Sequence, residues 1–300
     1  MISSLNPNPM APSTKNFLAP QAGMNKTAAD FSIPILMYHE VAKPERVEQI
    51  AQKTQRTFIV TIEQFETQME WLVNNGFSAI SLTEVLQIQS GAHALRPGEK
   101  PVVITFDDGF AGNYFHAFPI LRRLNLTATI FVVVNHVGEP FYLTWQQMET
   151  MAGNGIDIQS HTMTHALLGQ ASTGQLIYEL RESKREIENK LGTPVHFISL
   201  PHGSCHQEFA KVARDYGYRG GCTSELAFAG LHSPAFALPR ICVNSQYDLA
   251  TFMSIAQSNP EFVNRKAVSR KIKRAIKNFV GEKNYNRAYH LIYGVQENIS

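Results

Sequence analysis

The sequence predicts an α/β protein in which parallel strands form a sheet or a barrel. Short apolar segments rich in β-branched residues alternate with amphipathic segments of helical period, which is typical of βα units and a parallel sheet. A chain of 300 residues is long enough for one such barrel with appendages, and its 44% hydrophobic and 17% charged residues are ordinary for a globular protein. Polar clusters also follow two predicted strands, at the edge where α/β folds build active sites.

Eight segments are predicted as strands because they are short, apolar and bounded by turn-forming residues. The clearest is 102–106 (Val-Val-Ile-Thr-Phe), which two aspartates and a glycine follow at once. The predicted strands are residues 34–38, 78–80, 102–106, 128–134, 156–160, 196–200, 218–222 and 240–243.

Seven segments between these strands are predicted as helices. In 173–191, apolar residues such as Leu176, Leu180 and Ile187 recur at helical spacing among Glu, Arg and Lys. Gly192 and Pro194 follow directly, as expected where a helix ends. The predicted helices are residues 62–75, 82–89, 113–124, 144–153, 173–191, 206–216 and 248–257.

The two ends of the chain differ from this alternating pattern. Residues 1–30 are mixed in Asn, Pro, Ser and Thr, without the basic and apolar regions of a secretory signal, and are predicted to be a flexible tail. A basic helical pattern begins at about Asn264. We therefore expect one α/β domain over 31–258 and a helical C-terminal extension over 259–300.

Composition limits the partners and the location of the protein. The formal charge is +2, and no basic block lies among aromatic residues, so nucleic acid is not an expected partner. No apolar run approaches ~18 residues, so no transmembrane span is expected. Without a recognisable signal, a cytoplasmic location is expected, with export left open. The sequence does not indicate an oligomeric state.

Two polar clusters together predict a metal site with its own base. Residues 105–109 are Thr-Phe-Asp-Asp-Gly, and residues 160–165 are Ser-His-Thr-Met-Thr-His. Alone, the first is typical of a turn, and the second of a surface or helix face. At two strand ends, however, two imidazoles and one carboxylate make three ligands for a divalent cation, with positions left open. The spare carboxylate can then accept a proton from metal-bound water.

These motifs resemble those of the polysaccharide deacetylases, carbohydrate esterase family 4 with the NodB homology domain. The first family motif, Thr-Phe-Asp-Asp-Gly, is matched by residues 105–109, and the second, His-Ser/Thr-x-x-His, by His161, Thr162 and His165. The resemblance covers about residues 33–255. Its start, 34–41 (Pro-Ile-Leu-Met-Tyr-His-Glu-Val), is similar to the opening strand of the exopolysaccharide-deacetylase-like branch. The resemblance implies a distorted (β/α) barrel of the NodB type.

The resemblance also implies roles. Asp107 would be the general base, and Asp108, His161 and His165 would hold one divalent metal ion, most often zinc and in some relatives nickel, cobalt or iron. The implied activity is that of a hydrolase that removes N-acetyl groups from an N-acetylated sugar or glycan by attack of metal-bound water. An amidase acting on a non-sugar N-acyl compound and a catalytically silent glycan-binding module are the alternatives.

The third family motif, Arg-x-Pro-Tyr/Phe-Gly, is altered. Pro201 and Gly203 match it, but Ser199 stands where arginine is usual and His202 where an aromatic residue is usual. Backbone amides of the loop that carries His202 could stabilise a tetrahedral oxyanion. We therefore expect Pro201, His202 and Gly203 to contact the substrate.

In relatives, the missing arginine holds the base aspartate in place. Ser199 is too short and carries no charge, so another cation is expected to take over this role. Arg240 is the candidate, and we expect its guanidinium to reach Asp107 from a neighbouring strand end. An ion pair on the surface is the alternative for Arg240.

The family's usual general acid is a histidine in a late Leu-x-His motif, which has no clean copy here. Among His39, His202, His232 and His290, we prefer His39 because it ends the first predicted strand. A hydrogen-bonded structural role is its alternative.

Two aromatic residues are candidates for a sugar-binding wall, because aromatic faces suit pyranose rings. They are Tyr142 and Trp145. For Trp145 a place in the core is the alternative.

Overall fold

A parallel eight-stranded sheet forms the centre of the protein, which a computed structural model describes for residues 32–268. The strand order is β10–β1–β5–β6–β7–β8–β9, and β4 pairs with the beginning of β5. The strands are β1 (Ile35–Tyr38), β4 (Phe77–Ala79), β5 (Lys100–Phe106), β6 (Ala128–Val132), β7 (Ile156–Ser160), β8 (Phe197–Ser199), β9 (Gly220–Cys222) and β10 (Ile241–Cys242).

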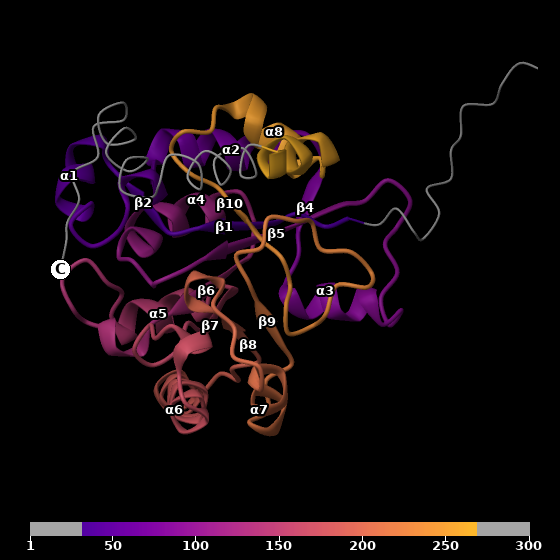
Figure 1. Ribbon diagram of the computed structural model, residues 1–300. Coiled ribbons are helices and arrows are strands. Elements are labelled where there is room, and N and C mark those ends of the chain that lie inside the picture. Colours follow the sequence, from indigo (N-terminus) through magenta and orange to yellow (C-terminus); the bar gives the residue numbers. More distant parts are fainter. Residues whose placement is uncertain (1–31, 269–300) are drawn as a thin grey trace, which may run out of the picture.

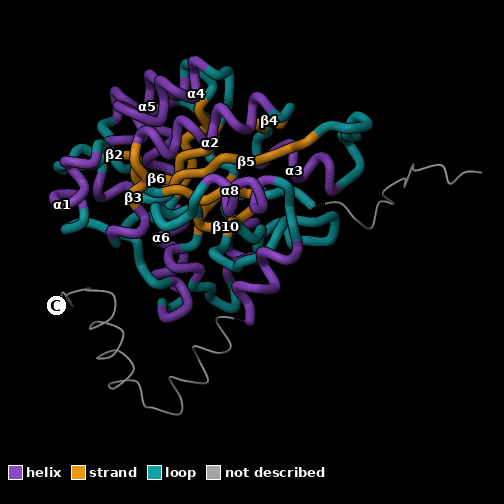
Figure 2. Tube along the Cα trace, turned by 90° about the horizontal axis from the view of Figure 1, so that it is seen from above, coloured by secondary structure: helices purple, strands orange, loops and turns teal. Residues whose placement is uncertain are grey.

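The sheet curls into a distorted (β/α) barrel, as the sequence predicts. Its two ends approach each other where Cys222 of β9 forms a parallel bridge with Leu238, just before β10. Figure 2 shows the strands at the centre with helices around them. In β5, Val103 and Ile104 face different apolar clusters, which is expected for a parallel strand buried on both faces.

Helices cover the outside of the barrel. Figure 1 shows α6 and α7 side by side on one side of the strands, and α2 and α8 together on the opposite side. Three of the helices, α2, α3 and α5, begin with a capping box, in which a Ser or Thr and a Gln or Glu satisfy each other's backbone amides. The helices are α2 (Ile62–Asn74), α3 (Leu82–Gln89), α4 (Phe118–Arg123), α5 (Trp145–Ala152), α6 (Thr173–Leu191), α7 (Phe209–Asp215) and α8 (Leu249–Ala256).

All eight predicted strands and seven predicted helices are present, most with ends shifted by one to three residues. Sequence analysis missed a second, two-stranded parallel sheet of β2 (Glu40–Ala42) and β3 (Ile59–Thr61), and the short helix α1 (Val47–Ile50) between them. Elements of three or four residues are too short to show a period. The predicted helix at 113–124 begins as a π-helix over Asn113–Ala117 before α4. Such turns are frequent at functional sites.

The predicted tail at 1–30 and most of the predicted C-terminal extension lie outside the described residues, so these domain boundaries stay predictions. The described part of the extension is helical from residue 260 to 268. Its Phe262 is buried and packs edge-on against Tyr247, with ring centroids 5.9 Å apart. Within 32–268, no helix has the length and apolar character needed to cross a membrane.

Candidate active site

Two carboxylates lie where β5 ends. The backbone N–H of Asp107 still donates to the Tyr38 carbonyl at 2.9 Å, so this residue continues the sheet pairing. The chain then turns, with Asp108 at φ 70° and Gly109 at φ 73°. A Cβ on Gly109 would lie 3.0 Å from Val132 Cγ1, so both the positive φ and the tight contact favour glycine. The turn gives the neighbouring carboxylates different surroundings.

The two motif histidines lie just past β7, the strand two positions away in the sheet. His161 donates its backbone N–H to the Val132 carbonyl at 2.8 Å, and His165 has φ 62°. Glu179 of α6, which is buried, holds the loop between them. Its carboxylate accepts from the backbone amides of Met163 and Thr164 at 2.8 and 2.9 Å. Sequence analysis missed Glu179, since a glutamate on a helix fourteen residues away resembles any surface residue.

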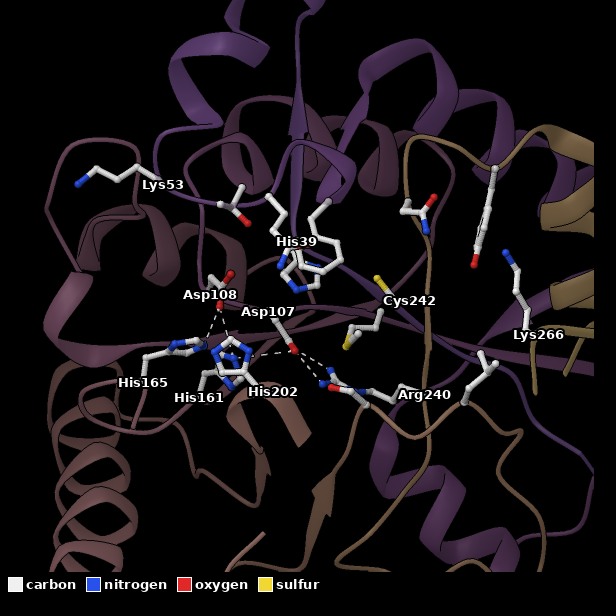
Figure 3. Close-up of a pocket in the computed structure, with 18 residues that line it drawn as sticks. His39, Lys53, Asp107, Asp108, His161, His165, His202, Arg240, Cys242 and Lys266 are labelled. Atoms are coloured by element: carbon white, nitrogen blue, oxygen red, sulfur yellow. Dashed lines mark hydrogen bonds and ion pairs between the residues drawn. The ribbon is translucent and has the colours of Figure 1, made fainter. Parts of the chain in front are cut away.

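Asp108, His161 and His165 form a group suited to a metal ion. One ligand atom from each lies within 4.8 Å of the others. Nε2 of His161 and Nε2 of His165 lie 3.4 and 3.5 Å from Asp108 Oδ1 (Figure 3). The Ser199 carbonyl lies 2.9 Å from His161 Nδ1, and because a carbonyl only accepts, Nδ1 carries a proton and Nε2 is the ring nitrogen left to face Asp108 or a metal. A fixed tautomer and an N₂O donor set fit a divalent cation such as zinc.

The surroundings of the two imidazoles shift their pKa values in opposite directions. Burial by itself lowers the pKa of His161, but the carboxylates of Asp107 and Asp108 outweigh it and raise that pKa above its ordinary value. Burial and the neighbouring His161 lower the pKa of His165 to about 4. A neutral His165 at ordinary pH is the form that can donate a lone pair to a metal.

Arg240 binds the other carboxylate, that of Asp107. Its Nη1 and Nη2 donate to Asp107 Oδ1 and Oδ2, each at 2.7 Å, in a forked pair (Figure 3). The remaining guanidinium donors bond Thr105 Oγ1, Ser199 Oγ and the Thr223 carbonyl at 3.2, 2.7 and 3.1 Å. Arg240 is fully buried, and all its donors are satisfied. The alternative of a surface ion pair is therefore wrong.

Ser199 takes part in the same arrangement instead of an arginine. It ends β8, and its hydroxyl donates to Asp107 Oδ2 at 3.1 Å while accepting from Arg240. A small residue at 199 leaves room for the guanidinium that arrives from beside β10. The arginine that binds Asp107 therefore comes from directly before β10, whereas the family motif would place it at position 199, at the end of β8.

The arginine also sets the charge of the base. Burial alone would raise the pKa of the Asp107 carboxyl, but the Arg240 charge, His161 and the forked hydrogen bonds hold that pKa well below its usual range. Burial would likewise raise the pKa of Asp108. The hydrogen bond from His161 and the charges of nearby histidines outweigh burial and lower that pKa. Both carboxylates are ionised at neutral pH.

A cavity of about 520 Å³ opens over these groups and has the size of a small-ligand site. Its lining includes the two motif aspartates and the two motif histidines, together with His39, His202 and Arg240. His39 stacks face to face on Phe58, with ring centroids 4.3 Å apart. His202 has φ 55°, and strained backbone of this kind concentrates at functional sites. His232 lines a different, shallow depression, and His290 lies outside the described residues.

Other predicted contact residues lie elsewhere. Tyr142 is buried against Phe110, with stacked rings 5.0 Å apart, and Trp145 begins α5 and packs on the main core. Neither lines the cavity. Pro201 and Gly203 shape the loop behind His202 without lining it. The aromatic side chains that line the cavity are instead Phe58 and Tyr247, which the three motifs do not include.

Comparisons with known proteins identify the family. The chain matches the family model for polysaccharide deacetylases over residues 94–221. It is 32% identical over 233 residues to YxkH of Bacillus subtilis (strain 168), whose name assigns it to the polysaccharide deacetylases; the match covers 78% of this chain and 79% of that protein. The chain therefore belongs to the polysaccharide deacetylase family, carbohydrate esterase family 4, as its motifs predict.

Two further relatives extend this result. Poly-β-1,6-N-acetyl-D-glucosamine N-deacetylase of Staphylococcus aureus (strain MSSA476) is 25% identical over 228 residues, which cover 70% of this chain and 78% of that enzyme. Among solved structures, the deacetylase PplD of Streptococcus pyogenes in complex with acetate is 27% identical with a TM-score of 0.68. That match covers 75% of this chain and 98% of PplD.

Proposed function

We propose that this protein is a metal-dependent hydrolase that removes N-acetyl groups from an N-acetylated glycan. The observation that carries the proposal is the division between two adjacent carboxylates. Asp108 faces His161 and His165, whereas Asp107 is held apart by Arg240. A metal-binding group with a separate, oriented carboxylate beside it is what hydrolysis of an amide by water requires.

Asp108, His161 and His165 would hold the metal. When bound, a divalent cation polarises a carbonyl oxygen and lowers the pKa of water. Asp107 would accept the proton of the attacking water. Its carboxylate is ionised, and the forked bonds from Arg240 fix its plane, so it is oriented before the substrate arrives. The loop of His202, whose side chain lines the cavity, would then offer a donor to the oxygen on which negative charge develops.

His39 would carry a proton to the departing nitrogen. Its ring lines the cavity, lies near enough to Asp107 and Asp108 to feel their charges, and is held flat against Phe58. Burial lowers the pKa of His39, although those two carboxylates oppose the shift, so the resting imidazole is neutral. A neutral ring can take up a proton and release it to an amine as the C–N bond breaks.

This role predicts how His39→Ala behaves with two kinds of substrate. Turnover of an N-acetylated amino sugar should fall by ~10²–10⁴, because an amine leaves only when protonated. Hydrolysis of 4-nitrophenyl acetate should fall much less, since nitrophenolate departs without a proton. Paired assays with equal metal content check this. Equal losses on the amide and the ester would contradict the role.

The metal ligands can be tested by His161→Ala. The variant should fold but bind a divalent metal at least about 10-fold more weakly, because one of three protein ligands is gone. Elemental analysis after dialysis, with thermal unfolding as the control for folding, measures this. Unchanged metal stoichiometry would show that the ion binds elsewhere.

The substrate class follows from the relatives and the cavity. The Staphylococcus enzyme is named for poly-β-1,6-N-acetyl-D-glucosamine, and the aromatic rings of Phe58 and Tyr247 can lie against a pyranose ring. Acetate release across N-acetylglucosamine oligomers, N-acetylated glycolipids and small acyl-amides, with several divalent metals, tests the proposal. Release only from the acyl-amides would favour a non-sugar amidase, and sugar binding without release a silent glycan-binding module.

A further inference from the structure

We propose that Asn113 is a positioning residue that holds His39 in place for proton transfer, an inference that rests on the function proposed above. Asn113 is the first residue of the π-helix that follows the turn carrying Asp107 and Asp108. It is completely buried, and its Nδ2 donates to the backbone carbonyl of His39 at 2.8 Å. One side chain thus joins the loop of the two carboxylates to the proposed proton carrier.

A second contact joins the same two segments. The buried carboxyl group of Glu40, directly after His39, accepts from the backbone amides of Val41 and Gly112 at 2.7 and 3.4 Å. The approach is so close that a Cβ on Gly112 would lie 1.9 Å from Glu40 Oε1 and 2.1 Å from the Val41 carbonyl. Only glycine fits here, so the turn at 112 is built around Glu40.

The location of these contacts explains why they would matter for chemistry. His39 lies in the single residue gap between β1 and β2, where the chain leaves the barrel sheet for the small second sheet. Its imidazole has a stacking partner in Phe58 but no hydrogen bond to its buried Nδ1 from the described residues. The backbone and the stacked Phe58 ring therefore set the position of the imidazole. Strand pairings hold the backbone on either side of His39, at Tyr38 and at Glu40, and Asn113 binds the His39 carbonyl between them.

The π-helix places Asn113 where it can bind the His39 carbonyl. Its wide turn begins at Asn113, directly after the tight glycine turn, and α4 continues from it. The residue that binds the His39 carbonyl thus lies only five and six positions from Asp108 and Asp107. One short segment therefore carries both the two carboxylates and the residue that binds the His39 carbonyl.

Replacement of Asn113 tests the inference. In Asn113→Leu, which removes the donor at similar size, turnover of an N-acetylglucosamine oligomer should fall by up to about 10²-fold, because a displacement of about 1 Å has that effect. Metal content and hydrolysis of 4-nitrophenyl acetate should stay near wild type. In an His39→Ala background, the same change should cause no further loss on the amide, since Asn113 acts through His39.

Asn154→Leu is the matched control, because Asn154 Nδ2 also donates to a backbone carbonyl at 2.8 Å but lies on the surface. Should Asn113→Leu fail to fold, Asn113→Ser removes the same bond with a smaller side chain. Equal losses on amide and ester, or losses that multiply with those of His39→Ala, would overturn the inference while leaving the proposed function intact. Full activity of His39→Ala would instead remove the proton-carrier role itself.

Discussion

Asp107→Asn should retain the metal and lose most of its turnover. The carboxylate that accepts the proton is replaced by an amide of the same shape, and loss of a general base lowers rates by ~10²–10⁴. Asp107 lies outside the metal group, with its Oδ2 3.9 Å from His161 Nε2, so metal affinity should change little. Acetate release at saturating metal, together with a metal titration, measures both quantities.

Asp108→Asn is the matched comparison, because the same substitution is made one residue away. This variant should lose metal affinity first, and its activity should recover in part at high metal concentration. The two aspartates share a strand end but face different partners, His161 and His165 on one side and Arg240 on the other. If both variants give the same metal titration and the same rates, the division of roles is wrong.

Arg240→Ala should be the single change that lowers stability most, and it should also lower activity. Removal of one partner of a buried ion pair leaves an uncompensated charge and typically costs about 3–5 kcal/mol of unfolding free energy. Without the guanidinium, burial raises the pKa of Asp107, so the base becomes harder to ionise. Denaturant unfolding of chelator-treated protein measures the stability loss without a contribution from bound metal.

Two further variants separate charge from geometry. Arg240→Lys keeps a cation but not the forked donors, so it should recover part of the stability and little of the activity. Arg123→Ala removes an exposed arginine that bonds Glu66 at 2.7 Å, and should cost no more than about 1 kcal/mol. An Arg240→Ala protein as stable and active as Arg123→Ala would contradict the assignment.

Much of this site could be predicted because its chemistry is local in sequence. Asp107 and Asp108, like His161 and His165, lie within a few residues of a strand end, and parallel strands bring those ends to one edge. Arg240 could be proposed only because Ser199 cannot provide a cation. That reasoning predicted that Asp107 needs a cationic partner. The structure shows that Arg240, directly before β10, provides it through two forked hydrogen bonds.

The remaining parts depend on contacts that no local pattern encodes. Glu179 and Asn113 look like ordinary helix residues until the fold places their side chains on the histidine loop and on His39. Tyr142 and Trp145 were expected at the cavity because aromatic residues bind sugars. Their rings instead pack against Phe110 and the core, since burying large apolar surface is the commoner use of such side chains.

The most direct test of the account is acetate release from an N-acetylglucosamine oligomer by protein that has been stripped of metal and then reloaded. We expect no acetate from the stripped protein, and release of acetate with a matching amount of free amine once one equivalent of a divalent metal is added. His161→Ala, treated in the same way, should not recover. Equal acetate release by the stripped protein, or none by protein shown to hold metal at Asp108, His161 and His165, would contradict the proposed function.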